Sequence, residues 1–577
     1  MREARRRHAA LTSFGVTTVR TARAIACSAL VGAACILSLA TTTRAQRVTP
    51  PLTGSSLRGL DVVHYEFSVV FPASGRADTI AVSEVIMVRR TSRSDTLVLD
   101  LAPAMIVSEA SIAGRGTPFV RDGATVRIPL PAGSGDSLRV GVKLMGVPKD
   151  GLVVRRDSVL GTWTAFADHF PNRAREWLAT VDHPSDKATV EWIVRAPTTH
   201  RVIGNGNLLE ETPVYPLTSG SVPMTLTRWR TVRPIYTAVM VIGVAPFSVF
   251  ELGSAACGKA ELPGCVRQSV WVSPDVRPSM PGAFARANDM VDLFTRLAGP
   301  YPYEKLAHVQ SSTRYGGMEN ASAIFYSDAA FRRGTISESL VAHETAHQWF
   351  GDAITTREWP HVWLSEGFAT YFAELWDEHA HGDSAFLAGM RRVRENVLKS
   401  VITVEKPVVD TLLDDVGRVL NSNVYQKAGF TLHMLRRQVG DSAFFRGVRA
   451  FYAKHRHGNA LTDDFMREVE LASAQKLGWF FDQWMRRPGY AELTVTQRHD
   501  KARNAIILDV VQGTRFAPYR LRMSVDVTDA QGRTRRGWVD IPATRQASVR
   551  VPLLISGTPD RVVLDAGVSV LGTVTLQ

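Results

Sequence analysis

The sequence is poor in cysteine and in long apolar runs. Its 577 residues include four cysteines, which is too few for a fold held together by disulfides. Residues 25–40 form its one long uninterrupted apolar stretch, and a helix needs roughly 20 such residues to span a bilayer. These shortages exclude a disulfide scaffold and a multi-span membrane protein. The 45% hydrophobic and 21% charged residues are typical of a globular protein of several domains.

The apolar stretch has the flanks of an export signal. Several arginines lie ahead of it, and Thr43-Arg44-Ala45 follows it. A basic segment, a short apolar core and a small-residue cleavage site are the parts of a secretory signal peptide. We therefore expect residues 1–45 to be a signal peptide cleaved before Gln46, and the mature protein to be periplasmic or extracellular. Two alternatives remain open: an uncleaved segment that tethers the chain to a membrane, and a lipid on Cys35.

The charge balance indicates no polyanionic partner. Seven arginines and one glutamate in residues 1–45 account for +6 of the formal net charge of +13, which leaves +7 on residues 46–577. This excess is small and contains no run of lysine and arginine, so we expect no nucleic-acid partner. No second long apolar run follows, so we also expect no membrane span in the mature chain. Cys257 and Cys265 form either a short disulfide loop, which an oxidising compartment favours, or two free thiols.

Three successive patterns divide the chain. From about 55 to 250 apolar and polar residues alternate, as around Tyr65, Phe67 and Val69, which predicts a large, mostly antiparallel β-domain. Helical spacing then dominates to about 487, and short alternating strands return after Pro488-Gly489. We therefore predict a multidomain α+β protein. Its parts are a signal peptide at 1–45, an N-terminal β-domain at 46–252, a mainly helical domain at 253–488 and a C-terminal β-sandwich at 489–577.

The helical part contains a metal-binding pattern. His343 and His347 lie four residues apart, with Glu344 between them. Residues four apart lie on one face of a helix, so both imidazoles can bind one metal ion while Glu344 points to its open position. Glu366 opens the next helical segment and is the candidate for the third ligand. Two histidines, one carboxylate and a water suit a tetrahedral Zn²⁺, although cobalt or manganese would also accept these ligands.

The residues around these ligands resemble the gluzincin zinc aminopeptidases. Gln348-Trp349-Phe350-Gly351 follows the second histidine, and Glu366-Gly367-Phe368-Ala369 keeps the family's spacing. The chain is similar to alanyl aminopeptidase and other aminopeptidase N-like metallopeptidases. This resemblance implies a thermolysin-like catalytic domain, one zinc per chain and Glu344 as the general base. Asp352 and Ser365 stand where the family more often has asparagine.

Further matches to the family imply residues that contact the substrate. The family's exopeptidase motif, a strand edge along which the substrate lies, is matched by Gly316, Gly317, Met318, Glu319 and Asn320. Its glutamate, here Glu319, anchors the free α-amino group. Tyr425 matches the tyrosine that donates a hydrogen bond to the oxyanion. A looser alignment of the N-terminal domain puts Asp168 in place of a glutamine that contacts the substrate amine.

These matches predict an exported zinc aminopeptidase that hydrolyses the N-terminal peptide bond of peptides with a free N-terminus. The chain resembles a short form of the family, without the large helical C-terminal domain, because about 90 strand-like residues follow Gly489. A zinc endopeptidase and a catalytically silent peptide-binding relative are the alternatives. The sequence determines neither the preferred N-terminal residue, the physiological substrate, the oligomeric state nor any epoxide hydrolase side activity.

Overall fold

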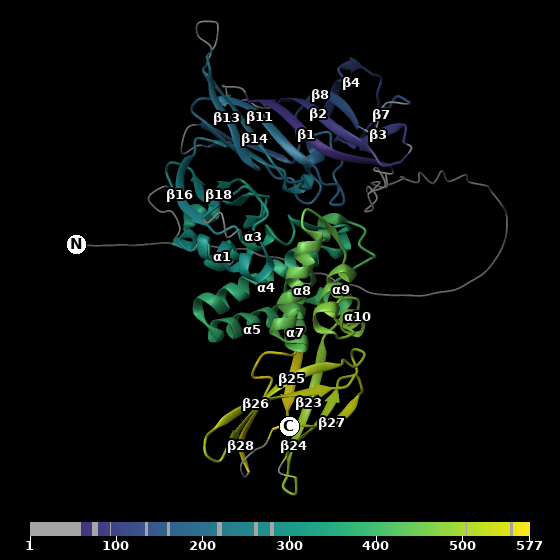
Figure 1. The fold of residues 1–577 in the computed structure, drawn as a ribbon, viewed down its shortest axis with the longest axis vertical. Helices are drawn as coiled ribbons and strands as arrows, with labels where there is room; N and C mark the ends of the chain where they lie inside the picture. The colour runs from purple at the N-terminus through teal and green to yellow at the C-terminus, as the bar shows by residue number, and fades with distance from the viewer. Residues whose placement is uncertain are drawn as a thin grey trace, which may run out of the picture. The chain divides into compact units, whose positions relative to one another are not determined.

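The computed structural model describes residues 59–577, except 72–78, 93, 133–136, 158–161, 216–221, 259–263, 277–281, 504 and 554–557 (Figure 1). The predicted signal peptide and its cleavage site lie outside the described residues. The described residues belong to one compact unit, with β-sheets first, helices in the middle and strands again at the end. This order confirms a multidomain protein with an N-terminal β-sheet domain and a helical middle domain. No helix of the described part is long and apolar enough to cross a membrane.

The described residues of the N-terminal part form three β-sheets. Alternation along β1 explains its place in the core, because Tyr65, Phe67 and Val69 are buried while their neighbours are partly exposed. Strand β1 pairs in parallel with β11, and the other pairs of its sheet are antiparallel. The eight-stranded sheet has the order β13 (Asn207–Val214), β14 (Met224–Arg230), β11 (Thr189–Pro197), β1 (Leu60–Val70), β2 (Ile80–Arg90), β8 (Ser137–Gly146), β4 (Met105–Ile112), β5 (Arg115–Gly116).

Two smaller sheets complete this part. The three-stranded sheet has the order β3 (Thr96–Asp100), β7 (Thr125–Pro129), β6 (Val120–Asp122). The four-stranded sheet has the order β12 (Arg201–Gly204), β15 (Ile242–Ala245), β10 (Thr162–Ala167), β9 (Leu152–Asp157). The mostly antiparallel pairing agrees with the alternation of the sequence.

The predicted boundary between residues 252 and 253 falls inside a strand. Strand β16 pairs with β17 in the sheet of the middle part, so the chain changes sheet between β15 and β16. The alternation of apolar and polar residues runs on across this change of sheet, so the sequence pattern does not mark it. The five-stranded sheet has the order β16 (Ser248–Ala255), β17 (Val266–Val272), β18 (Lys305–Ser311), β20 (Ala323–Ser327), β19 (Gly317–Met318).

Helices build the rest of the middle part. Helix α4 is central, because its residues from Trp363 to Trp376 are almost all buried and it packs against α3, α5 and α7. The described helices are α1 (Ala287–Ala298), α2 (Asp328–Arg333), α3 (Glu338–His347), α4 (Trp363–His381), α5 (Asp383–Lys399), α6 (Val401–Glu405), α7 (Ala428–Val439), α8 (Asp441–His455), α9 (Thr462–Ser473) and α10 (Gly478–Trp484). Two short strands, β21 (Ile354–Thr356) and β22 (Gly458–Ala460), pair with each other.

The C-terminal part consists of two sheets. Buried residues such as Val495, Leu508, Met523 and Val525 give it a core. The four-stranded sheet has the order β27 (Gln546–Arg550), β24 (Ala505–Gln512), β23 (Ala491–Asp500), β29 (Gly572–Leu576). The three-stranded sheet has the order β26 (Thr534–Ile541), β25 (Leu521–Asp529), β28 (Pro559–Leu564).

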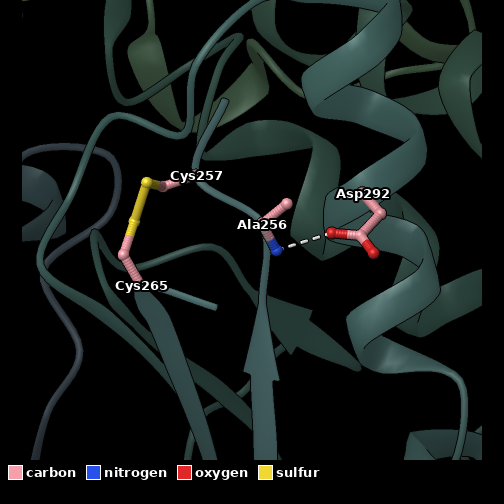
Figure 2. Close-up of a disulfide and its surroundings, with 4 residues drawn as sticks. All are labelled: Ala256, Cys257, Cys265 and Asp292. Carbon is pink, nitrogen blue, oxygen red and sulfur yellow. Dashed lines mark hydrogen bonds between the residues drawn. A yellow bond between two sulfur atoms is a disulfide. The ribbon is translucent and has the colours of Figure 1, made fainter. Parts of the chain in front are cut away.

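Cys257 and Cys265 form a disulfide between β16 and β17 (Figure 2). Their Cα atoms are 5.6 Å apart, within the usual range for a disulfide. Beside the bridge, Asp292 Oδ1 of α1 accepts a hydrogen bond from the backbone N–H of Ala256 at 2.7 Å. The structure therefore contains the disulfide and not the two free thiols that the sequence left as the alternative.

Candidate metal centre

Helix α3 carries the predicted metal-binding pattern. Its start is fixed by Ser337, whose side-chain oxygen accepts a hydrogen bond from the backbone N–H of Leu340 at 3.1 Å. One helical turn separates His343 from His347, so both imidazoles lie on the same face. Their Nε2 atoms are 3.1 Å apart.

The third predicted ligand comes from the first turn of α4. Glu366 Oε2 lies 3.6 Å from His343 Nε2 and 3.3 Å from His347 Nε2. Ligand atoms that bind a tetrahedral zinc at about 2.0–2.2 Å are themselves about 3.4 Å apart. The three atoms therefore have the separations that a zinc ion requires.

The surroundings of Glu366 also fit a cation. Its Oε2 is buried and has the imidazoles of His343 and His347 beside it, and a buried carboxylate is costly unless a positive charge lies next to it. Burial raises the pKa of Glu366, but the adjacent His347 imidazole more than offsets this and brings it to about 2. The ionised carboxylate and two imidazoles thus form a set able to hold a divalent metal.

Backbone and hydroxyl oxygens orient His347. Its Nδ1 lies 3.1 Å from Phe350 O and 2.9 Å from Ser365 Oγ. A proton on Nδ1 satisfies these oxygens and leaves Nε2 free to bind a metal. Ser365 is one of the two positions that depart from the family. The other, Asp352, accepts a hydrogen bond from Gln348 Nε2 at 2.9 Å. Both departures therefore lie directly beside the metal-binding helix.

Glu344 faces strand β19. A Cβ atom at Gly317 would lie 2.2 Å from Glu344 Oε1, so glycine is what lets the strand approach this carboxylate. Strand β19 is the outermost strand of its sheet, the position expected for a strand that pairs with a peptide. Burial raises the pKa of Glu344, the direction that suits a group taking up a proton near neutral pH.

Glu319 follows directly after β19. Its side chain is 5% exposed, and its carboxylate forms a second group with Glu344 and His347 in which the ligand atoms lie within 4.8 Å of one another. Gln348 Nε2 donates a hydrogen bond to Glu319 O at 2.8 Å, while Gln348 Oε1 accepts one from Ser322 N at 2.7 Å. One amide at the end of α3 therefore fixes the segment that carries Glu319.

Two other residues of the predicted substrate motif are buried beside Glu319. Met318 packs in the hydrophobic core, and Asn320 is fully buried. Neither side-chain polar atom of Asn320 has a hydrogen-bond partner among the described residues. The structure thus places these residues at the site but gives the Asn320 amide no contact there.

Tyr425 lies beside His343, in the π-helical turn η8 (Asn423–Lys427). Its ring is parallel to that of His343, with 6.1 Å between centroids and 19° between planes. Burial raises the pKa of the Tyr425 hydroxyl well above its ordinary value, so the group stays protonated and able to donate a hydrogen bond. Single π-turns occur often at functional sites.

Asp168 lies among arginines. Its Oδ1 is 2.9 Å from Arg173 Nη2, and its Oδ2 is 3.2 Å from Arg314 Nε. Asp150 pairs with the same two arginines. The ion pairs join β10, which ends just before Asp168, to the segment that leads into β19. Contact between Asp168 and a substrate amine stays a prediction, and the arginine partners are what the sequence did not reveal.

A cavity of about 540 Å³ opens beside the predicted ligands. It extends from Gly316 and Gly317 past Glu344 and Tyr425. Its far wall comes from α4 and α5 and includes residues that sequence reasoning missed, namely Thr370, Glu374, Arg392, Asn396 and, from η8, Gln426. The helical spacing offered a signal for two of them, because Thr370 and Glu374 follow Glu366 by four and eight residues.

Known proteins match the part of the chain that contains this candidate site. Residues 285–484 match the Peptidase family M1 domain. Tricorn protease-interacting factor F2 of Thermoplasma acidophilum is 28% identical over 260 residues, which are 42% of this chain and 32% of the relative. Aminopeptidase N of Streptomyces lividans is 27% identical over 350 residues, 55% of this chain and 37% of the relative. Glutamyl aminopeptidase of Rattus norvegicus is 26% identical over 366 residues, 60% of this chain and 37% of the relative.

A solved structure shares the fold. The M1 zinc metallopeptidase from Deinococcus radiodurans superposes with a TM-score of 0.62 at 23% sequence identity, covering 75% of this chain and 94% of that chain. The matched part of the present chain spans about a third of the length of the curated relatives.

The fold and the metal centre define a metallopeptidase domain. The match of residues 285–484 to the Peptidase family M1 domain confirms the resemblance to the gluzincin aminopeptidases that the metal motif indicated. This family is zinc-dependent, and the separations of His343, His347 and Glu366 suit that metal.

Proposed function

We propose that this chain is a zinc aminopeptidase that hydrolyses the N-terminal peptide bond of peptides with a free N-terminus. The supporting observation is the position of Glu319, whose carboxylate lies within 4.8 Å of Glu344 and His347 ligand atoms at the end of an edge strand. A substrate ammonium bound to this carboxylate leaves room for one residue before the metal ligands. The first peptide bond is therefore the one presented for attack.

The residues of the site divide the reaction among themselves. A bound zinc lowers the pKa of water and polarises the substrate carbonyl. Glu344 takes the proton of the attacking water and passes it to the leaving amine. Tyr425 donates a hydrogen bond to the oxyanion that develops on the attacked carbonyl. The backbone of Gly317 and Met318 aligns the peptide, and Glu319 holds its ammonium group.

A panel of chromogenic aminoacyl anilides tests this function. The purified protein should release the amine from substrates with a free N-terminus, and a zinc chelator should stop the release. N-acetylated anilides are the matched controls and should remain intact. Absence of release by zinc-loaded protein from any free-amine substrate would contradict the proposal and favour the catalytically silent relative.

Substitution of Glu319 separates the proposal from a zinc endopeptidase. Glu319→Gln keeps the size of the side chain but removes the charge that pairs with an ammonium group. Its kcat/KM for free-amine peptides should fall on the order of a hundredfold, because a charge-assisted contact in a dry site is lost. Efficient cleavage of acetylated peptides by the unmodified protein would instead support the endopeptidase.

We also propose export of the protein and a C-terminal β-sandwich built from the two C-terminal sheets. The basic and apolar residues of 1–45 support export, as does the Cys257–Cys265 disulfide, since such bonds persist in oxidising compartments. Buried residues contributed by both C-terminal sheets support the sandwich. Mass spectrometry of the protein secreted from its host would test cleavage before Gln46.

A further inference from the structure

The cavity beside the metal ligands continues beyond the point at which the proposed reaction takes place. Its described lining includes Gly316 and Gly317 but neither Met318 nor Glu319. Under the proposed function the substrate amine is held at Glu319, so the cavity extends from the metal ligands away from the amine. It therefore receives the part of the peptide that follows the scissile bond.

Arg392 faces this half of the cavity from α5. It is exposed and lines the cavity together with Asn396, which lies one helical turn further along. Among the described residues Arg392 forms no hydrogen bond and no direct ion pair, although its charge acts at longer range on the carboxyls of Glu374 and Asp377 and opposes the rise of their pKa. Arg394 on the same helix is instead paired directly with Asp565 of the C-terminal part. An exposed arginine that no carboxylate contacts directly is suited to bind a carboxylate of the substrate.

An acidic group, Glu374, lines the same cavity and feels the charge of Arg392 without forming a direct ion pair with it. Glu374 of α4 is 9% exposed, and a Cβ atom at Gly389 would lie 1.6 Å from its Oε2. Glycine at 389 thus provides the space in which the Glu374 carboxyl lies between α4 and α5, which pack together (Figure 1). Burial raises the pKa of Glu374 to about 7, so a neutral carboxyl that donates a hydrogen bond is accessible at physiological pH.

The distance along α4 between Glu366 and Glu374 indicates how long a peptide must be to reach Arg392. Glu366 and Glu374 are eight residues apart, which is about 12 Å along a helix at about 1.5 Å per residue. An extended peptide advances about 3.3 Å per residue. Three to four residues beyond the metal ligands therefore bring the end of an extended peptide to the level of Glu374 and Arg392.

We propose that Arg392 binds a substrate carboxylate on the leaving-group side of the cleft, and that this carboxylate is the C-terminus of a short peptide. The proposal rests on the proposed aminopeptidase function. It makes Arg392 a determinant of substrate length, because a longer chain carries its terminal carboxylate past the guanidinium. Short peptides with a free carboxyl end are then the preferred class of substrate.

Paired peptides that differ at one end test the proposal. Tetra- and pentapeptides are supplied as free acids and as C-terminal amides, and kcat/KM is measured for each. The unmodified protein should prefer the acid on the order of tenfold, as expected when one charge-assisted contact is removed. A peptide amide with an acidic residue near its end distinguishes a side-chain carboxylate from the terminal one.

Neighbouring arginines provide the matched variants. Arg392→Gln should reduce the ratio of acid to amide to about one. Arg391→Gln removes an equal charge from the same helix outside the cavity lining, and it should keep the preference of the unmodified protein. Equal rates for acid and amide in the unmodified protein, or an equal loss in both variants, would overturn the proposal.

A binding measurement keeps this test separate from that of the proposed function. If zinc-loaded protein hydrolyses no free-amine anilide, the proposed function fails. Calorimetric titration of Glu344→Gln protein with a tetrapeptide acid and its amide then decides the role of Arg392. Tighter binding of the acid, lost in the additional Arg392→Gln change, upholds the proposal, and equal binding of acid and amide overturns it.

Discussion

Glu344 is the residue whose substitution separates chemistry from metal binding. It lies between the two histidines but is not one of the three ligands with zinc-like separations. Glu344→Gln should lower kcat on the order of a thousandfold while the protein retains its zinc, because proton transfer is lost and the ligands are untouched. Anilide hydrolysis and metal analysis on the same sample measure both effects.

Glu338→Gln is a suitable control for this change. Glu338 lies in the first turn of the same helix and pairs at the surface with His381. Its substitution tests whether removal of any carboxylate from α3 affects turnover. Near-normal activity of Glu344→Gln protein would contradict the role of this carboxylate as the base.

At the scale of single residues, local spacing made the metal ligands predictable. His343 and His347 lie on one helix, where the helical repeat puts both side chains on the same face, and their Nε2 atoms are 3.1 Å apart. Local spacing could not predict the ion pair between Asp168 and Arg314, because the two residues are 146 positions apart in sequence. A contact of that kind depends on how sheets and helices pack, and spacing does not encode it.

Strand β19 approaches α3 closely because residue 317 is a glycine, which has no side chain to collide with Glu344. Gly317→Ala would place a methyl group 2.2 Å from Glu344 Oε1, so strand or carboxylate must move. We expect kcat/KM to fall at least about tenfold with unchanged zinc content, since displacements near 1 Å disturb catalytic geometry this much. Gly316→Ala is the comparison, because a Cβ there would meet nothing within 4 Å. A loss in Gly316→Ala as large as in Gly317→Ala would argue against the steric explanation.

The contact between α4 and α5 makes stability depend on pH. Burial raises the pKa of Glu374 to about 7 in the folded protein, above its ordinary value of 4.5. The folded state therefore binds this proton more tightly, and the stabilisation present below pH 4.5 is lost as the pH rises through about 7. Glu374→Gln has no such proton, so its free energy of unfolding relative to the unmodified protein should increase between pH 5 and pH 8 by on the order of 2 kcal/mol.

Denaturant unfolding at both pH values measures this difference. Glu395→Gln, on the exposed face of α5, is the matched control and should show no such change. A stability difference between Glu374→Gln and unmodified protein that does not vary with pH would contradict the raised pKa of Glu374.

At the scale of elements, long regular segments were predictable and short irregular ones were not. The alternation around Tyr65 and the helix containing His343 follow from repeated patterns over many residues. Strand β19 contains two residues, and η8 is a single π-turn. Neither is long enough to show a period. Only the resemblance to a family indicated that Gly317 belongs to a strand edge and that Tyr425 faces the metal ligands.

For the whole molecule, the Cys257–Cys265 disulfide links stability to the redox conditions around the protein. The bridge closes a loop with a sequence separation of 8 residues. Loss of such a bridge costs about 2–3 kcal/mol when the entropy of the unfolded chain dominates. Cys265→Ser should therefore lower the midpoint of thermal unfolding, and a reducing agent should lower it equally in unmodified protein. Insensitivity of unmodified protein to the reductant, with both thiols shown to be free, would contradict the bridge.

The side-chain amide of Gln348 bears on how many residues each cleavage releases from the N-terminus of a peptide. It holds the segment of Glu319 on one side and belongs to the end of the metal-binding helix on the other. One side chain therefore helps to fix the distance between Glu319, which holds the first amino acid on the proposed function, and the candidate metal ligands, where hydrolysis takes place. On the proposed function, the protein therefore removes a single residue from the N-terminus of a peptide at each cleavage.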